Sequence, residues 1–242
     1  MAATAFGLAA APTGPAPPRV LMVTYSAGYQ HDVVRRLAPG TLSLAERVVD
    51  DLGRRSASFE VTHVASRDDL ARLTTASVRG HRALLFFTTG ELPIDATVRD
   101  AMLQSVRDGA GFVGVHSATD TWYTVPAYQE LVGGVFDGHP WHQRVRLVVE
   151  DRTHPATQHL GERFELLDEI YQFRAWSRAD VHVLLRLDPA SVDLARGKRS
   201  DQDYALAWTK TFGRGRVIYT ALGLEPATRA AALQASKSAW VG

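Results

Sequence analysis

The sequence contains no cysteine among its 242 residues. This absence excludes disulfides, thiolate metal sites and a cysteine nucleophile. The chain also lacks an excess of either charge, with 27 Lys and Arg against 26 Asp and Glu. A formal net charge of +1 gives no strong field to attract nucleic acid or an anionic membrane surface, so we expect neither partner. No apolar run approaches the length of a membrane-spanning helix.

The first 18 residues, "MAATAFGLAAAPTGPAPP", carry no charged side chain. They are similar to the apolar and cleavage regions of a secretory signal that lacks its basic region. A disordered, low-complexity leader has the same composition. We therefore expect residues 1–18 to lie outside the fold and residues 19–242 to form a single domain. Both a cytoplasmic and an exported (periplasmic or extracellular) location remain open.

Strand and helix patterns alternate through the first half of the chain. Helical patterns cover residues 42–55, the short segment 68–73, and residues 94–109. The first of these helices is expected to end near Gly53. Apolar or alternating runs typical of strands cover 19–26, 59–66, 83–90 and 111–118. This order predicts an α/β fold with a doubly wound, mostly parallel sheet flanked by helices.

The second half has a larger share of strand patterns. Residues 119–144 are expected to form an inserted, loop-rich segment, and a final helix at about 226–240 would close the fold. Strands are expected at 145–151, 181–188, 205–213 and 216–223. The turn "FGRGR" predicts a hairpin between the last two of these strands.

The stretch "GFVGVHSATD" places His116 at the end of an apolar strand. In open α/β sheets, ligands bind beyond the carboxyl ends of the strands. The residues "GVHSA" have the layout of a nucleophile elbow with histidine at its centre, and Ser117 is off-centre for that role. Imidazole serves as a general base or metal ligand near neutral pH. The structural alternative is a strand-end histidine bonded to a carbonyl group.

A second motif, "GGVFDGHPWHQ", contains His139 and His142 at H-x-x-H spacing. This spacing suits a shared divalent metal such as zinc, or a shared polar ligand, with a third group from elsewhere in the chain. Pro140 favours a loop here. Trp141 offers a flat apolar face of the kind on which sugar rings stack. The structural alternative is a surface loop with incidental histidines.

Two further segments offer polar groups. "SAGYQHD", residues 26–32, follows the first strand and has the position of a first βα binding loop. It lacks the G-x-G-x-x-G pattern, so no nucleotide cofactor is expected. In "LLDEIYQFR", an extended backbone would point Asp168 and Glu169 to opposite faces, so only one could enter a site. Beside a histidine, that carboxylate could orient the imidazole or bind a metal. Otherwise the two form a solvated acidic pair.

Together the motifs resemble the ThuA-like (trehalose-utilisation) family. The resemblance spans about residues 19–224 and rests on "TYSAGYQHD", "FFTTGE", "GAGFVGVHSATDTWY", "YQELVGGVFDGHPWHQ", "VVEDRTHPAT", "DEIYQF", "VHVLLRLD" and "ALAWTKTFGRGRVIYTALG", in that order. The family is similar in fold to the class I glutamine amidotransferases. The resemblance implies that His116 stands where those enzymes carry their catalytic cysteine, so amidotransferase chemistry is not expected.

The family is associated with bacterial use of trehalose and other disaccharides. The resemblance therefore implies a small-molecule sugar partner and an enzyme of lyase, hydrolase or isomerase type. Such an enzyme would act on a disaccharide or 3-keto-glycoside by histidine-based proton abstraction, with assistance from a metal. The alternative is a non-catalytic carbohydrate-binding or accessory module, which is favoured by Leu224 standing where the family usually continues "TALGH". A homo-oligomer is compatible with both.

The motifs and the resemblance together give a set of expected site residues. We expect His116, Glu169 and Tyr123 to be catalytic, Tyr25, His31, Gly90, Asp120, Trp141 and Tyr171 to contact the sugar, and His116, His139 and His142 to hold the metal.

Overall fold

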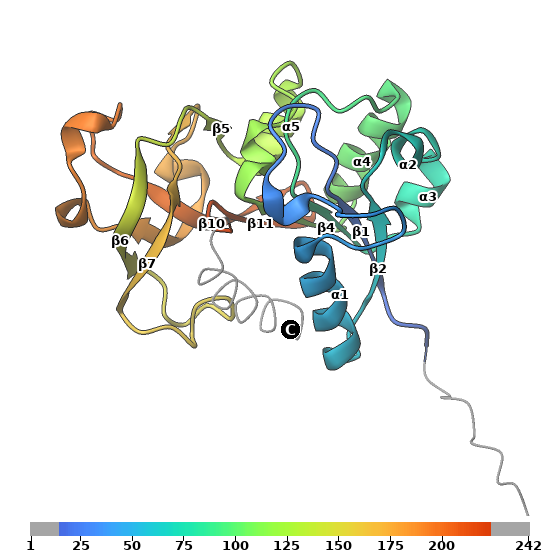
Figure 1. Ribbon diagram of the computed structural model, residues 1–242, viewed down its shortest axis with the longest axis horizontal. Helices are drawn as coiled ribbons and strands as arrows, with labels where there is room; N and C mark the ends of the chain where they lie inside the picture. Colours follow the sequence, from blue (N-terminus) through green and yellow to red (C-terminus); the bar gives the residue numbers. More distant parts are fainter. Residues whose placement is uncertain (1–14, 224–242) are drawn as a thin grey trace, which may run out of the picture.

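The computed structural model describes residues 15–223, which are built around one nine-stranded sheet. Its strand order is β2-β1-β3-β4-β11-β10-β9-β6-β7 (Figure 1). A second sheet pairs β5 (Val135–Phe136) with β8 (Phe173–Arg174). The strands of the large sheet are β1 (Arg19–Val23), β2 (Glu60–Val64), β3 (Ala83–Phe86), β4 (Gly111–Val115), β6 (Trp141–Val149), β7 (Arg163–Ile170), β9 (His182–Leu187), β10 (Ala205–Phe212) and β11 (Gly215–Thr220).

Helices cover both faces of the parallel half of this sheet. In Figure 1, α1 lies on one face, and α2 to α5 lie on the other. The α-helices are α1 (Leu44–Ser56), α2 (Arg67–Ala71), α3 (Thr75–Arg79), α4 (Ala96–Arg107) and α5 (Pro126–Val132). Short 3-10 turns occur at η1 (Asp32–Val34), η2 (His116–Asp120), η3 (Arg178–Asp180), η4 (Pro189–Ser191) and η5 (Leu194–Arg196).

The sheet changes from parallel to antiparallel along its width. Strands β2, β1, β3, β4 and β11 are parallel neighbours, and β10, β9, β6 and β7 pair antiparallel. Within β1, Val20 and Met22 belong to the cluster that contains Leu52 of α1. Leu21 and Val23 belong to the main core on the opposite face. A strand buried on both faces reads as a continuous apolar run, and the predicted α/β fold class is confirmed.

Helix α1 does not end at Gly53 but continues to Ser56. Glycine at position 53 instead lets the helix backbone pack closely against Phe59, because a Cβ atom there would lie 2.5 Å from the Phe59 carbonyl oxygen. The helix ends where Ala57 adopts the left-handed conformation, with φ of 52°. A Gly within a helical pattern is thus not by itself a helix end.

The segment 119–144 is more regular than its sequence indicates. It contains α5, β5 and the start of β6. Helix α3 and strand β7 were not among the elements expected from periodicity. The final helix expected at 226–240 lies outside the described residues, as do residues 1–14 of the expected leader.

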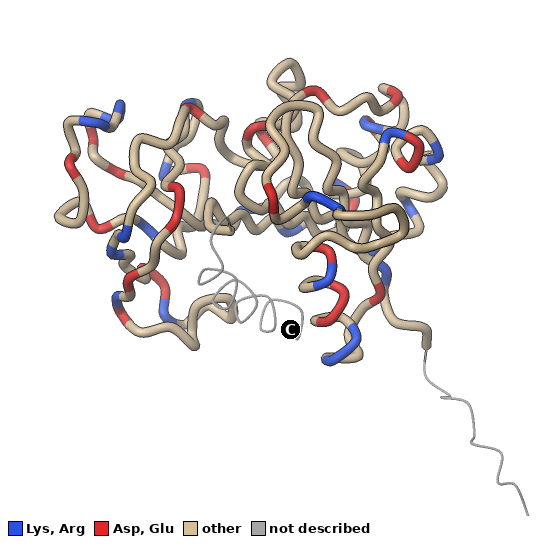
Figure 2. Tube along the Cα trace, viewed as in Figure 1, with Lys and Arg blue, Asp and Glu red and all other residues tan. Residues whose placement is uncertain are grey.

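Charged residues of both signs are interspersed over the described chain (Figure 2). Within residues 15–223, no helix is both long enough and apolar enough to cross a bilayer.

Candidate active site

His116 begins the turn η2 directly after β4 and has φ of +47°. This left-handed conformation costs a non-glycine residue about 1–2 kcal/mol. Two contacts hold it: the Tyr219 hydroxyl donates to the His116 carbonyl oxygen at 2.6 Å, and Nδ1 of the ring lies 2.5 Å from the carbonyl oxygen of Ala221. A carbonyl oxygen only accepts hydrogen bonds, so Nδ1 carries the proton and Nε2 faces the site. The elbow geometry expected from "GVHSA" is present, with a buried imidazole at its centre.

Glu169, on β7, connects two imidazoles. Its Oε2 lies 3.4 Å from His116 Nε2, and its Oε1 lies 3.2 Å from His139 Nδ1. The neighbouring Asp168 is fully buried and accepts a hydrogen bond from the backbone N–H of Gly223. One carboxylate of the pair therefore joins the histidines, and the other binds the chain that follows β11.

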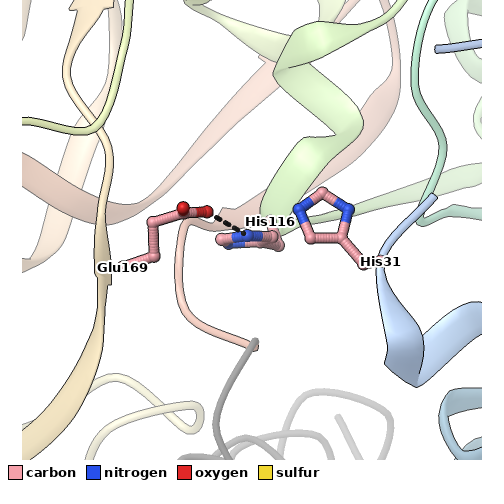
Figure 3. A group of neighbouring side chains, drawn as sticks. All are labelled: His31, His116 and Glu169. Atoms are coloured by element: carbon pink, nitrogen blue, oxygen red, sulfur yellow. Dashed lines mark ion pairs between the residues drawn. The ribbon is translucent and has the colours of Figure 1, made fainter. Parts of the chain in front are cut away.

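His31 completes a compact group with His116 and Glu169. It lies in the loop after β1, immediately before η1, and its side chain is buried. Its ring centroid is 4.8 Å from that of His116, with the ring planes at 79°. One potential ligand atom from each of the three residues lies within 4.8 Å of the others. In Figure 3, a ring nitrogen of His31 and the carboxylate of Glu169 approach His116 from opposite sides.

The two histidines of the H-x-x-H motif take different positions. His139 lies between β5 and β6, and its side chain is 49% exposed. Its ring stacks on Phe136, with centroids 5.9 Å apart and planes at 21°. His142 lies on β6, not in a loop, and pairs in register with Glu169 of β7. Pro140 marks the last residue before β6, so the expected loop covers only half of the motif.

Aromatic rings enclose the buried side of the site. The Tyr171 ring lies 4.2 Å from the His116 ring and 4.4 Å from the Phe136 ring, measured between centroids. Phe136 and Tyr219 were not among the expected site residues. "GGVF" and "VIYT" are indistinguishable from core segments in sequence. Only the fold brings Phe136 to His139 and Tyr171, and the Tyr219 hydroxyl to His116.

Asp120, Tyr123 and Gly90 form a neighbouring polar group. The Tyr123 hydroxyl donates to the Asp120 carboxylate, and the Asp120 carbonyl oxygen accepts from Gly90 N–H at 2.7 Å. Gly90 has φ of +74°, and a Cβ there would lie 2.7 Å from the backbone nitrogen of Gly28. Glycine is therefore required where the β3 and β1 loops meet. Tyr25 is partly buried against the main core.

Trp141 is fully buried, contrary to our expectation that it offers a stacking face. Its indole N–H donates to the carbonyl oxygen of Asp193 at 2.9 Å, and its ring meets Tyr204 edge to face. The start of β6 points this ring into the core, where no sugar can reach it. Tyr29 is the exposed aromatic beside the site: it is 73% exposed, and its ring centroid lies 5.0 Å from that of His31.

Burial and neighbouring charges set the protonation of the group. Burial, followed by the charge of His116, lowers the pKa of His31 to about 4, so this ring is neutral near pH 7. Burial alone would raise the pKa of Glu169, but the contact with His116 and the charge of His139 outweigh it and lower that pKa. Burial raises the pKa of the Asp120 carboxyl, and the hydrogen bond from Tyr123 opposes that rise. The site thus contains an ionised carboxylate beside a neutral imidazole.

Ser117 is not positioned as a nucleophile. Its hydroxyl oxygen is buried and makes no hydrogen bond within residues 15–223, so no base in that range is placed to activate it. Three histidines elsewhere have partners of their own: His63 lies 3.6 Å from Asp50, His81 bonds to Ser77 and Thr62, and His182 bonds to Asp151.

The fold and the site define an α/β protein with a histidine elbow and a buried histidine–carboxylate group at the carboxyl edge of its parallel strands. The chain belongs to the ThuA family, described as trehalose utilisation, whose family model matches residues 19–234. Membership makes it a carbohydrate-associated protein related to trehalose utilisation. This confirms the family resemblance found in the motifs.

Solved structures show the same fold. A ThuA-like protein from Bacteroides uniformis ATCC 8492 is 23% identical, with a TM-score of 0.68 over 94% of this chain and 92% of that one. A ThuA-like protein from Parabacteroides merdae ATCC 43184 is 16% identical, with a TM-score of 0.68 over 93% and 89%. A cytoplasmic protein from Salmonella typhimurium LT2 is 14% identical, with a TM-score of 0.58 over 92% and 97%. No curated protein matches the chain.

Proposed function

We propose that this protein acts on a disaccharide or 3-keto-glycoside by removing a proton from the carbon beside the sugar carbonyl. The observation that carries the proposal is the position of Glu169 between a buried imidazole, His116, and a half-exposed one, His139. A histidine held by a carboxylate is a common arrangement for a general base. The family's association with trehalose utilisation supports a sugar as the substrate.

His139 is the better candidate for the base that touches the substrate. A base must reach the proton that it removes. The His116 ring is fully buried, so its expected role as the base conflicts with access. His139 is half exposed, and its Nδ1 faces Glu169, which leaves Nε2 available to a ligand. His116 and Glu169 then affect the substrate indirectly: Glu169 contacts His139, and His116 contacts Glu169.

The step breaks one C–H bond of the sugar. The proton passes to Nε2 of His139, and the electron pair of that bond forms the carbon–carbon double bond of an enolate. The π electrons of the carbonyl group move to its oxygen. The Glu169 carboxylate stabilises the resulting imidazolium through Nδ1–H. Catalysis by such a base typically contributes about 10²–10⁴-fold to the rate.

Two neighbouring features suit the rest of a sugar ring. Tyr29 offers an exposed aromatic face next to His31. Sugar C–H groups pack on such faces, while the hydroxyl groups need polar partners. Asp120 and Tyr123 supply a carboxyl and a phenol, joined to each other by a hydrogen bond.

The test uses substitutions of two histidines and 3-keto-trehalose as the probe. His139→Ala should lower kcat by about 10²–10⁴-fold, because only the proton-transferring group is removed. His159 is exposed in the segment before β7 and makes a matched control, so His159→Ala should leave kcat unchanged. Full activity of His139→Ala would show that the base is misassigned.

The alternative, a non-catalytic carbohydrate-binding or accessory module, predicts sugar binding without turnover. Calorimetry with the wild-type chain would then show heat of sugar binding, while no product forms over a long incubation. Product formation that depends on His139 would exclude this alternative.

A further inference from the structure

We propose that His31, His116 and Glu169 bind one divalent transition-metal ion, such as Zn²⁺. The ion would be the group that polarises the sugar carbonyl, and this catalytic role rests on the proposed function. The ligand set differs from the one expected from sequence, which combined His116 with His139 and His142. The three residues come from the loop after β1, the turn directly after β4 and the C-terminal end of β7.

The first argument is the hydrogen-bond geometry of His116. Its Nδ1–H donates to the Ala221 carbonyl oxygen, so Nε2 is the ring nitrogen that faces Glu169. The carboxylate oxygen facing it is an acceptor, and so is Nε2 unless the ring carries a second proton. Two acceptors in a buried site need a positive group between them. That group is either a second proton on the imidazole or a cation.

The distances favour the cation. A charge-assisted N–H···O bond is about 2.7–2.9 Å long. The observed separation between His116 Nε2 and Glu169 Oε2 is 3.4 Å, and Nε2 makes no hydrogen bond within the described residues. Ligand atoms about 2.1 Å from a tetrahedral zinc lie about 3.4 Å from one another. His116 Nε2 and Glu169 Oε2 are therefore separated by the distance expected between two ligand atoms of one tetrahedral zinc ion.

His31 supplies the third ligand. Its side chain is only 4% exposed, and the three ligand atoms lie within 4.8 Å of one another. Figure 3 shows a ring nitrogen of His31 turned toward His116. For these atoms to close around an ion, the longest separation must shorten by about 1.4 Å, from 4.8 Å to the roughly 3.4 Å of a tetrahedral shell. Nδ1 of His31 is buried and makes no hydrogen bond within residues 15–223, as expected for a nitrogen that awaits a ligand.

The proposed ligands make the kind of hydrogen bonds and polar contacts that orient metal ligands in other proteins. A metal-binding histidine usually donates its other N–H to a carbonyl or carboxylate group, as His116 does to Ala221. Glu169 is held in turn by His139, which contacts the oxygen that His116 does not. Two histidines and one glutamate are a known donor set of catalytic zinc, with the fourth position open to water or substrate. Imidazole donors favour zinc and its neighbours over Mg²⁺ or Ca²⁺.

The experiment measures metal binding without any sugar. Full-length protein without a histidine tag is freed of metal with a chelator and titrated with Zn²⁺ by calorimetry and with Co²⁺ by visible absorption. We expect one ion per chain and the Co²⁺ spectrum of a four-coordinate site. His31→Phe, which fills the same buried space, and Glu169→Gln, which is isosteric, should each abolish that spectrum. Circular dichroism verifies that both variants fold.

A matched variant separates this ligand set from the one expected from sequence. The double substitution His139→Ala and His142→Ala should keep one bound ion, with affinity weakened by at most about 10–100-fold through lost support of Glu169. If the wild-type chain binds no stoichiometric Zn²⁺ or Co²⁺, or if His31→Phe and Glu169→Gln bind as tightly as it does, the proposed site is wrong. Metal binding without turnover of sugar would instead contradict only the proposed function.

Discussion

At the scale of single residues, the site depends on backbone conformations that most side chains avoid. His116 adopts φ of +47° and is held by Tyr219 and by Ala221. Gly90 adopts φ of +74° where the loop after β3 meets Gly28. Conformations of this kind persist where surrounding contacts over-determine them, and they concentrate at functional sites.

Gly90→Ala should destabilise the protein by about 1 kcal/mol for its positive φ and by about 1–3 kcal/mol more for the contact with the Gly28 backbone. Gly40 is the matched control, because it has φ of +76° and nothing within 4 Å of a Cβ built there. Gly40→Ala should therefore lower the free energy of unfolding only by the roughly 1 kcal/mol that the positive φ costs. Urea unfolding measures both free energies. Equal losses in the two variants would show that the close approach at Gly28 carries no weight.

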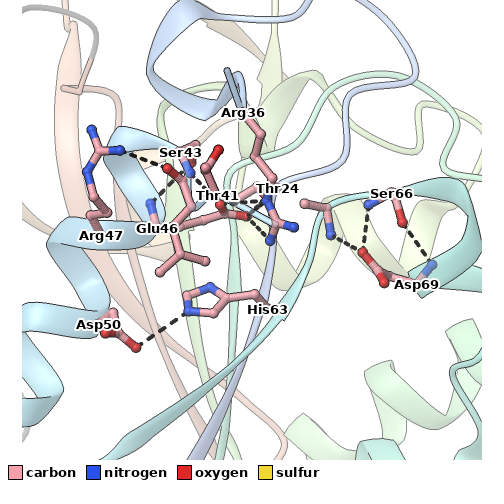
Figure 4. A network of polar contacts seen from close by, with 12 residues as sticks. Thr24, Arg36, Thr41, Ser43, Glu46, Arg47, Asp50, His63, Ser66 and Asp69 are labelled. Carbon is pink, nitrogen blue, oxygen red and sulfur yellow. Dashed lines mark hydrogen bonds and ion pairs between the residues drawn. The ribbon is translucent and has the colours of Figure 1, made fainter. Parts of the chain in front are cut away.

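At the scale of elements, the N-terminus of α1 is tied to the end of β1 and to the loop that carries His31. Figure 4 shows the network centred on Glu46, which is completely buried. Its carboxylate accepts hydrogen bonds from the Ser43 backbone N–H at 2.7 Å, the Thr24 hydroxyl at 2.7 Å and the Arg36 guanidinium at 2.8 Å. The Ser43 hydroxyl accepts from Glu46 N–H in return, which completes a capping box.

This network should make stability depend on pH. Burial alone would raise the pKa of Glu46, but the hydrogen bonds from Arg36, Ser43 and Thr24 outweigh it and lower that pKa. A carboxyl whose pKa is lower in the folded state stabilises the fold above its unfolded pKa of about 4.3. That stabilisation is lost as the pH falls through the folded pKa.

Glu46→Gln should therefore lower the free energy of unfolding at pH 7 by about 3 kcal/mol, because Arg36 loses its buried partner. The loss should shrink as the pH falls below about 4, since the wild-type carboxyl becomes protonated. Urea unfolding between pH 3 and 7 measures both curves. Curves that stay parallel over this range would contradict the role given to Glu46.

Element patterns explain which part of the fold was predictable. Strand β1 stands out as a continuous apolar run, and helix α4 stands out because its apolar positions repeat at the helix period. Strand β7 does not, because charged residues interrupt "RFELLDEI". His142 was placed in a loop because Pro140 precedes it, and its place on β6 results from pairing with β7. Pairing with a distant strand leaves no trace in a local pattern.

At the scale of the whole molecule, the site spans both halves of the sheet. His31 and His116 follow parallel strands, and Glu169 lies on β7 at the antiparallel edge. The strand order brings the three together, although four other strands separate β4 from β7. A site built in this way exists only when the whole sheet is formed.

We expect residues 19–242 to unfold as a single domain. Leu147 lies on β6 and is fully buried, so Leu147→Ala should cost about 2–5 kcal/mol. Because one sheet runs through both halves, this substitution should shift a single unfolding transition of the entire chain. Tryptophan fluorescence and far-ultraviolet circular dichroism in urea should give coincident midpoints. Two separate transitions, with only one moved by Leu147→Ala, would contradict a single cooperative domain.

The sequence by itself determined the alternation of strands and helices, the position of His116 at a strand end and the family. These features are local, since periodicity reports which face a residue occupies and an ordered set of motifs reports ancestry. Only the tertiary structure decided which histidines meet Glu169, that Trp141 is buried and that His31 faces His116. Those outcomes depend on strand order and register, which arise from packing between segments far apart in the chain.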